Sequence, residues 1–421
     1  MEGFVEGGYL PNGKPKLVCK LLKSLEGLKQ SGNNAQKNNV AHLVGPCGMT
    51  QLEQEPTMFK KYIEFGGQWI LLILVIWIDD ILAGYTRGRR KELLVPFYEK
   101  YHQRFPAKLL GPPKRYLGMD WIDAGDTLTL SHETYISNMV PKFVDADTLK
   151  QKVDLPATRG NDNSDPYIKL LLLWQAGGGT PTDKPFLSAL ASGMYATVYT
   201  RGCCSFHFAF LARFATRPIE EAWAALVVLL CFMYQTRRRH VLNYTRKEPA
   251  MPHLPTCKPP LDRTVFTRLR GLLVVSDASW KTEATYAGVI IFFAGAAVDW
   301  CSVLLKVQCS SAEAEIAAGS IGSKRMIYIR NVLGEIFTLP QIAISHVVDN
   351  SATPPLTENL GVAKKSEHFR RWLHFMRYCV LHGYSYVHLC KTHEMLANAL
   401  TKVENKHAYL HFAKVFYNIR S

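Results

Sequence analysis

The sequence predicts a multidomain chain of α/β and α+β architecture that ends in a mixed five-stranded sheet with helices. Its 421 residues are 48% hydrophobic and 20% charged, which suffices for about two or three domains with cores of their own. Residues 265–421 alternate strand-like and helix-like patterns: three strands, then a helix, a strand, a helix, a strand and a helix. An apolar run at 69–78 ends in two aspartates and predicts a buried strand.

The first 150 residues predict two strand hairpins and two helices. Residues 1–60 are polar and show little periodicity. After the strand at 69–78, we expect Asp79 and Asp80 in a turn and a return strand over 81–85. The further elements expected here are a helix over 91–105, a hairpin of 116–122 with 127–130, and a helix over 134–144.

Turn-forming residues predict two linkers between domains. The first is expected at 151–185, where 159–166 and 177–185 lack a core pattern, and the second at 246–264, which is rich in proline. Between them, helices are expected over 186–198, 206–213 and 220–239. The elements expected beyond residue 265 are strands over 272–276, 286–293, 297–304, 344–348 and 384–390, and helices over 311–336, 366–381 and 394–418.

The charge favours a polyanionic partner. The formal net charge is +15, which suits nucleic acid or an anionic membrane surface. Basic clusters occur at 87–91 and 237–239, and each of them is equally well explained as a solvated surface. No apolar run reaches the roughly 20 residues that span a bilayer, so we expect no membrane partner.

Ten cysteines are scattered along the chain, and none forms a Cys-x-x-Cys pair. This spacing argues against a zinc site. The start of the chain also lacks the pattern of a secretory signal. We therefore expect reduced cysteines and an intracellular location, in the cytoplasm or the nucleus.

Three acidic residues stand at the ends of predicted C-terminal elements. Asp277 directly follows the first strand, Glu315 lies in the first turns of the long helix, and Asp349 directly follows the fourth strand. Carboxylates that converge at one sheet edge repel one another unless cations neutralise them, and oxygen ligands suit Mg²⁺ or Mn²⁺. Two such ions would permit cleavage of a phosphodiester. Alternatively, each residue is a turn former or a helix cap.

The C-terminal part resembles the RNase H-like domain of copia-like LTR-retrotransposon polyproteins. Five segments carry the resemblance in the family's order, beginning with Val-Ser-Asp-Ala-Ser-Trp at 275–280. The resemblance implies cleavage of RNA in RNA–DNA hybrids, with Asp277, Glu315 and Asp349 as catalytic metal ligands. Asn398 stands where the family has a fourth aspartate, and it offers the metal a carbonyl oxygen without charge. The other segments are 309–316, 346–350, 364–379 and 396–402.

The N-terminal part resembles the reverse transcriptase of the same polyproteins. Trp-Ile-Asp-Asp at 77–80 is similar to the family's Tyr-x-Asp-Asp box, which implies catalytic and metal-binding roles for Asp79 and Asp80. Taken alone, the pair is equally well an ordinary β-turn. The resemblance further implies substrate contacts by Gln30, near the incoming nucleotide, and by Leu117 and Gly118, in the primer-contact turn. The remaining similar segments are 18–30, 128–136, 187–201 and 221–244.

The resemblance divides the chain into a reverse-transcriptase palm fragment, a helical connection region and the RNase H-like domain. In the family the third polymerase aspartate lies upstream, and no aspartate precedes Asp79 here. We therefore expect a degenerate, N-terminally truncated pseudoenzyme without polymerase activity and with an impaired endonuclease. The alternatives are a non-catalytic nucleic-acid-binding protein and a non-functional retroelement fragment. The expected boundaries are 1–150, 151–185 (linker), 186–245, 246–264 (linker) and 265–421.

Overall fold

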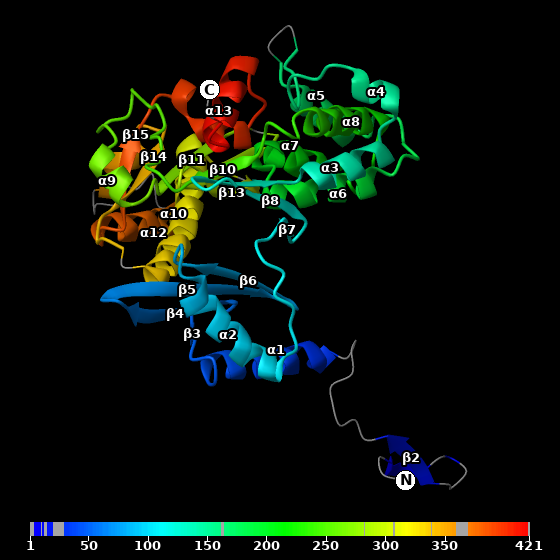
Figure 1. Ribbon diagram of the computed structural model, residues 1–421. Coiled ribbons are helices and arrows are strands. Elements are labelled where there is room, and N and C mark those ends of the chain that lie inside the picture. The colour runs from blue at the N-terminus through cyan, green and yellow to red at the C-terminus, as the bar shows by residue number, and fades with distance from the viewer. Residues whose placement is uncertain are drawn as a thin grey trace. The chain divides into compact units, whose positions relative to one another are not determined.

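The computed structural model shows a mixed helix and strand architecture with several separate sheets (Figure 1). By its internal contacts the chain divides into two units, one comprising 1–111 with 331–338, the other 112–330 with 339–421. This division differs from the expected domain boundaries because the helical region and the C-terminal sheet share one hydrophobic core. The residues described are 4–9, 11, 15–19, 29–160, 164–281, 283–305, 308–337, 339–358 and 369–419.

The first unit is built on a four-stranded antiparallel sheet in the order β3-β4-β5-β6. Alternate residues of β5 point into the core, among them Ile70, Leu72 and Leu74, as expected for a strand with one buried face. Leu43 of α1 and Leu93 of α2 complete this core. The bounds are β3 Thr50–Gln51, β4 Met58–Phe65, β5 Gln68–Trp77, β6 Asp80–Tyr85, α1 Lys29–Val44 and α2 Arg90–Arg104; β1 Phe4–Tyr9 pairs separately with β2 Pro15–Cys19.

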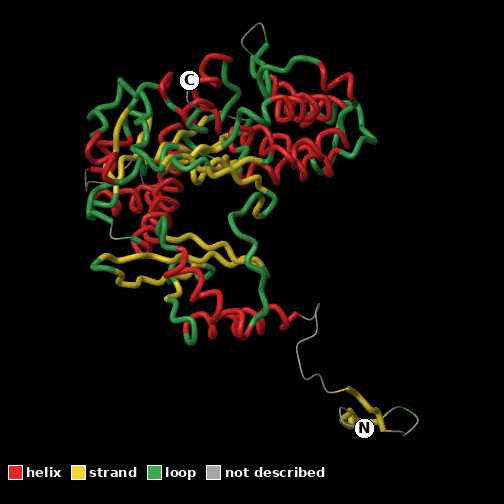
Figure 2. Tube along the Cα trace, in the orientation of Figure 1, coloured by secondary structure: helices red, strands yellow, loops and turns green. Residues whose placement is uncertain are grey.

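The second unit contains an antiparallel sheet in the order β10-β9-β8-β7, and a helical region lies between β9 and β10 along the chain. Figure 2 shows these helices gathered beside the strands. The strands are β7 Arg115–Tyr116, β8 Met119–Asp123, β9 Thr127–Ser131 and β10 Leu242–Thr245, and the helices are α3 Glu133–Met139, η1 Val140–Lys142, α4 Ala146–Lys150, α5 Pro166–Gln175, α6 Phe186–Tyr199, η2 Gly202–Cys204, α7 Ser205–Leu211, η3 Ala212–Phe214 and α8 Glu220–Gln235.

The C-terminal sheet is mixed and five-stranded, in the order β13-β12-β11-β14-β15. β12 is antiparallel to β11 and β13, whereas β14 is parallel to both β11 and β15. This arrangement confirms the predicted mixed five-stranded sheet with helices. The elements are α9 Arg263–Arg268, β11 Leu273–Ser279, β12 Thr285–Phe293, β13 Ala296–Leu305, α10 Ser311–Ile336, β14 Ile344–Val348, α11 Thr353–Glu358, α12 Arg370–Leu381, β15 Ser385–Leu389, η5 Thr392–Glu394, η6 Leu396–Leu400 and α13 Lys406–Phe416.

Three local predictions differ from the structure. The expected linker at 151–185 contains α5, whose Tyr167 and Leu171 are buried in the main core. The polar region 1–60 forms α1, although glycine and asparagine are poor helix formers. The expected strand over 116–122 is interrupted at Leu117 and Gly118, because both residues have positive φ and turn the chain.

No helix among the described residues is both long and apolar enough to cross a bilayer.

Candidate metal centre

Asp277 lies within the central strand of the C-terminal sheet. The sequence placed it just after the strand, but β11 continues to Ser279 because Asp277, Ala278 and Ser279 pair with β12. The side chain is therefore almost completely buried, with 2% of its surface exposed. Opposite Asp277 stands Gly288, where a Cβ atom would approach the Ala397 carbonyl oxygen to 2.8 Å. A glycine at this position thus allows η6 to pack directly against the sheet beside Asp277.

Glu315 and Asp349 reach the same place from different elements. Glu315 projects from the second turn of α10, and Asp349 directly follows β14, which is parallel to β11. One carboxylate oxygen from each of Asp277, Glu315 and Asp349 lies within 4.8 Å of the others. Within the described part of the chain, this is the single cluster of three or more potential metal ligands among histidine, cysteine, aspartate and glutamate. We call it the acidic triad.

The acidic triad carries an electrostatic cost. Burial raises the pKa of Asp277 to about 6, opposed by Lys402 and reinforced by the charge of Asp349. Burial also raises the pKa of Glu315, to about 10, and the charges of Asp277 and Asp349 contribute to the rise. Like charges that converge in a poorly solvated site favour the protonated forms. A divalent cation would remove this cost, because it restores attraction for each carboxylate.

Thr401, the C-cap residue of η6, forms a hydrogen bond with the triad. Its hydroxyl lies 2.6 Å from Asp277 Oδ2, to which it donates, and 3.0 Å from the Asn398 carbonyl oxygen. Asn398 is buried, and its amide nitrogen donates to the Thr392 carbonyl at 2.7 Å. Asn398 Oδ1 accepts no hydrogen bond from the described residues. Asn398 is therefore linked to the triad through Thr401, with one buried acceptor still available.

The second predicted pair of carboxylates has a different setting. Asp79 and Asp80 lie at the tip of the β5–β6 hairpin, where Ile78 adopts a positive φ. Both aspartates are exposed, and the neighbouring Ile78 side chain is 81% exposed. The structure confirms the predicted strand, turn and return strand. Within the described residues, no third carboxylate, histidine or cysteine joins the pair to form a cluster of ligands.

The predicted substrate-contact residues lie apart from each other in the chain. Gln30 belongs to α1, and residues 20–28 of its motif fall outside the described residues. In the C-terminal part, residues 364–368 of the segment 364–379 also fall outside them. Leu117 and Gly118 form the β7–β8 turn, and the Tyr195 hydroxyl donates to the Leu117 carbonyl at 3.1 Å. A Cβ atom on Gly118 would meet the same hydroxyl at 2.9 Å.

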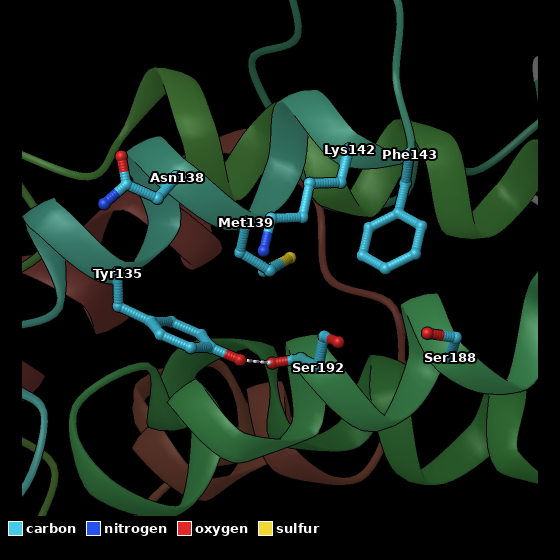
Figure 3. Close-up of a pocket in the computed structure, with 7 residues that line it drawn as sticks. All are labelled: Tyr135, Asn138, Met139, Lys142, Phe143, Ser188 and Ser192. Carbon is cyan, nitrogen blue, oxygen red and sulfur yellow. Dashed lines mark hydrogen bonds between the residues drawn. The ribbon is translucent and has the colours of Figure 1, made fainter.

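A small cavity of about 240 Å³ separates α3 and η1 from α6 (Figure 3). The Tyr135 hydroxyl crosses it and donates to the Ser192 carbonyl at 2.9 Å. None of the predicted site residues lines this cavity, so it adds nothing to the metal centre. Its lining consists of Tyr135, Asn138, Met139, Lys142, Phe143, Ser188 and Ser192.

Two further residues of the centre escaped the sequence analysis. Thr401 lies inside the 396–402 segment, whose resemblance drew attention to Asn398 alone. The charge of Lys402 is the largest cause that lowers the pKa of Asp277 against the effect of burial. Both residues lie within the segment 396–402, and that position is the sequence feature by which they could have been predicted as part of the centre.

Comparisons with known proteins agree with the architecture. Residues 5–156 match the family model described as reverse transcriptase (RNA-dependent DNA polymerase). The Retrovirus-related Pol polyprotein from transposon TNT 1-94 of Nicotiana tabacum is 26% identical over 406 residues, which cover 94% of this chain and 28% of that polyprotein. The polyproteins from transposons RE1 and RE2 of Arabidopsis thaliana are 25% and 24% identical, over 96% and 97% of this chain and 25% and 26% of their own lengths.

This chain therefore spans about a quarter of the length of these relatives. The three alignments run along nearly all of its residues, and the family model covers its N-terminal part. The chain is thus similar along nearly all of its length to retrotransposon Pol polyproteins, and its residues 5–156 match the reverse-transcriptase family model.

Proposed function

We propose that the C-terminal part of this chain cleaves the RNA strand of RNA–DNA hybrids in a metal-dependent reaction. The observation that supports this proposal best is the acidic triad, in which oxygens from Asp277, Glu315 and Asp349 lie within 4.8 Å of one another. Three elements distant in sequence bring these carboxylates together at an electrostatic cost, although Asp277 is almost completely buried, and no structural role explains that cost. A nuclease centre gives that arrangement a purpose.

The donor set suits Mg²⁺ or Mn²⁺, which prefer oxygen ligands. Asp277, Glu315 and Asp349 would hold the ion, and the free Oδ1 of Asn398 would offer a neutral fourth oxygen. When bound, a divalent cation activates a water molecule and stabilises the leaving oxygen of a phosphodiester. Thr401 holds the Asp277 carboxylate in place by its hydrogen bond. Because Asn398 brings no charge, a second ion would bind weakly, and the cleavage activity would be low.

Nucleic acid is the proposed partner because the chain carries a net charge of +15 and resembles reverse transcriptases. The 2′-hydroxyl groups of one strand would distinguish a hybrid from DNA. We place the protein inside the cell, in the cytoplasm or nucleus. The described cysteines are free thiols, which agrees with a reducing compartment.

We propose that the chain lacks polymerase activity. Phosphoryl transfer by a polymerase requires carboxylates that hold two metal ions. Asp79 and Asp80 form an exposed pair without a third ligand among the residues that the structure describes. The pair alone would bind a cation weakly, because water screens its charges.

A cleavage assay tests the proposed function. The full chain is incubated with Mg²⁺ and a hybrid whose RNA strand is labelled, and RNA fragments are measured over time. We expect cleavage by the unmodified chain and a loss of at least 100-fold for Asp277→Asn. The matched control Asp183→Asn removes an exposed carboxylate far from the triad in sequence, and should retain the full rate.

The outcomes also separate a second candidate function, a non-catalytic nucleic-acid-binding protein. The substitution of the family's aspartate by Asn398 and the strong positive charge favour that alternative. Hybrid binding without cleavage at any metal concentration would support it. Cleavage that survives Asp277→Asn would show that another group holds the metal.

A further inference from the structure

A cavity of about 620 Å³ opens in the second unit, where the C-terminal end of α8 meets α13 and the β9–β10 ribbon. Its size falls within the usual range of ligand sites. Three cationic side chains line it, together with polar groups from both strands. The lining residues are Thr127, Asp154, Phe232, Thr236, Arg238, Arg239, His240, Val241, Asn243, Leu410, Ala413, Lys414, Asn418 and Ile419. We call it the basic cavity.

The three arginines at 237–239 have different roles, although the sequence presents them as one cluster. Arg237 lies outside the basic cavity and donates to the Ser137 hydroxyl and the Tyr234 carbonyl. Arg238 lines the basic cavity and forms an ion pair with Glu133. Arg239 is exposed and has no side-chain partner among the described residues. One arginine of the cluster is therefore left with an uncompensated charge.

Lys414 supplies a second uncompensated charge from the facing helix. It is exposed in the last turn of α13, and it forms neither an ion pair nor a side-chain hydrogen bond with the described residues. Cations often occur at helix C-termini because they compensate the partial negative charge there. Compensation of the helix ends is therefore the alternative explanation for Arg239 and Lys414.

The carbonyl groups at both helix ends already accept hydrogen bonds. At the end of α8, the Phe232 and Tyr234 carbonyls accept from the backbone of Thr236, and Tyr234 also accepts from Arg237. At the end of α13, the Ala413 and Val415 carbonyls accept from Tyr417 and Asn418. Capping of these carbonyls therefore needs neither Arg239 nor Lys414, so their charges remain available to an external anion.

The acidic residue of the basic cavity does not cancel these charges. Asp154 is paired with Lys406 at 2.7 Å and with Lys152 at 3.6 Å. Both lysines together outweigh it, and the hydrogen bond from Lys406 is the largest cause that lowers the pKa of Asp154. The basic cavity and its rim thus carry an excess of positive charge.

The lining favours recognition of phosphate over recognition of a base. Its two rings, Phe232 and His240, are 1% and 6% exposed, and His240 stacks on Tyr417 with ring centroids 5.1 Å apart. A nucleobase would therefore find no free aromatic face to stack on. Exposed cations that emerge from two elements instead suit the spaced phosphates of a nucleic-acid backbone.

We propose that Arg239 and Lys414 make the basic cavity a binding site for the phosphate backbone of nucleic acid, separate from the acidic triad. This inference rests on the proposed function, because the RNA–DNA hybrid would be the natural ligand of the site. Binding there needs no metal, so it is measurable when the triad is inactive.

The test measures binding of a fluorescent RNA–DNA hybrid to the full chain by anisotropy, in EDTA and at several salt concentrations. For Arg239→Ala/Lys414→Ala we expect at least fivefold weaker binding at 150 mM salt. The slope of log affinity against log salt should become shallower by about 2, because two phosphate contacts are lost. Arg239→Lys/Lys414→Arg keeps both charges and should restore most of the affinity.

A matched control distinguishes binding at the basic cavity from nonspecific attraction of nucleic acid by the net charge of the chain. Arg268→Ala/Lys184→Ala removes the same charge from exposed positions of the same unit that lack side-chain partners among the described residues. It should weaken binding less than twofold. Equal losses for the two double variants would overturn the proposal. ATP binding that depends on Arg239 and Lys414 while hybrid binding does not would also overturn it, in favour of a free nucleotide.

The result can be distinguished from a failure of the proposed nuclease. A chain that binds the hybrid through the basic cavity but does not cleave it with Mg²⁺ would retain this inference and lose the nuclease. Cleavage with unchanged binding by Arg239→Ala/Lys414→Ala would retain the nuclease and lose this inference. Equal melting temperatures of the variants would establish that the losses do not come from unfolding.

Discussion

Two groups of carboxylates, the pair at the β5–β6 hairpin tip and the acidic triad, have the same functional group in very different environments. Asp79 and Asp80 are adjacent in sequence, lie at an exposed hairpin tip and meet no third ligand among the described residues. Asp277, Glu315 and Asp349 are separated along the chain, yet the C-terminal sheet and α10 bring their oxygens within 4.8 Å. The pair is a local feature, whereas the triad exists only in the folded domain.

The difference lies in solvation. Water and salt screen the repulsion between exposed carboxylates, so the hairpin tip needs no cation to remain folded. Burial removes that screening from the triad, and the pKa values of Asp277 and Glu315 rise to about 6 and about 10. Burial and convergence therefore make the carboxylates of the triad costly to ionise, and adjacency of two aspartates in a sequence does not have this effect.

The largest gain in activity should come from adding a fourth carboxylate to the triad. Asn398→Asp restores the residue type expected from the family, and its charge should strengthen binding of a second ion. We expect the rate of hybrid cleavage to rise about 10- to 100-fold, the range over which groups around a metal alter activity. Asn398→Ala, which removes the free Oδ1, should not raise the rate. An unchanged rate for Asn398→Asp would mean that this position does not reach the metal.

Burial also affects a basic group, the side chain of His207, by lowering its pKa. His207 is completely buried and hydrogen-bonded to Tyr167, and burial lowers its pKa to about 4. Since the unfolded chain binds this proton near pH 6.5, the stability that His207 contributes is present above pH 6.5 and is lost as the pH falls toward 4. Between pH 7 and pH 5 the loss is about 2 kcal/mol.

The measurement is the decrease in melting temperature between pH 7 and pH 5. His207→Gln should reduce this decrease, because glutamine does not titrate. The matched control His393→Gln replaces a histidine whose side chain is 70% exposed, and it should leave the decrease unchanged. Equal decreases for all three proteins would show that acid sensitivity arises elsewhere.

The smallest effect is metal-induced stabilisation of the folded chain. A cation at ten times its dissociation constant should stabilise the second unit by about 1.4 kcal/mol. Glu315→Gln resembles the protonated glutamate, so at pH 7 it should leave the metal-free melting temperature nearly unchanged and abolish the increase caused by Mn²⁺. Asp79→Asn/Asp80→Asn should retain that increase. Loss of the increase in the hairpin variant would contradict the comparison drawn above.

Sequence patterns predicted the elements around the triad well. The bounds of α10 and β14 coincide with the expected 311–336 and 344–348, because long amphipathic and short apolar runs there have clear ends. Helix α5 was missed inside an expected linker, although Asp165 caps it and Pro166 occupies its first turn. Those two residues are a recognised start signal that the surrounding turn formers concealed.

The candidate site was predicted by resemblance and only partly by pattern. A carboxylate after a strand is commonly a turn former, so Asp277, Glu315 and Asp349 formed a specific hypothesis only through the segments that surround them. Extension of β11 past Asp277 was not predictable, because it depends on register with β12. The basic cavity was not predictable either, because Arg238, Arg239 and Lys414 line it only after folding.

By itself the sequence determined the order of the elements beyond residue 265, the alternation that builds a mixed sheet, the excess of positive charge and the identity of the acidic residues. The tertiary structure decided which carboxylates converge, how deeply they are buried, and which cations remain unpaired. The physical reason is that periodicity is a local property of the chain. Solvation and proximity depend instead on contacts between residues far apart in sequence, and these set the chemistry of the site.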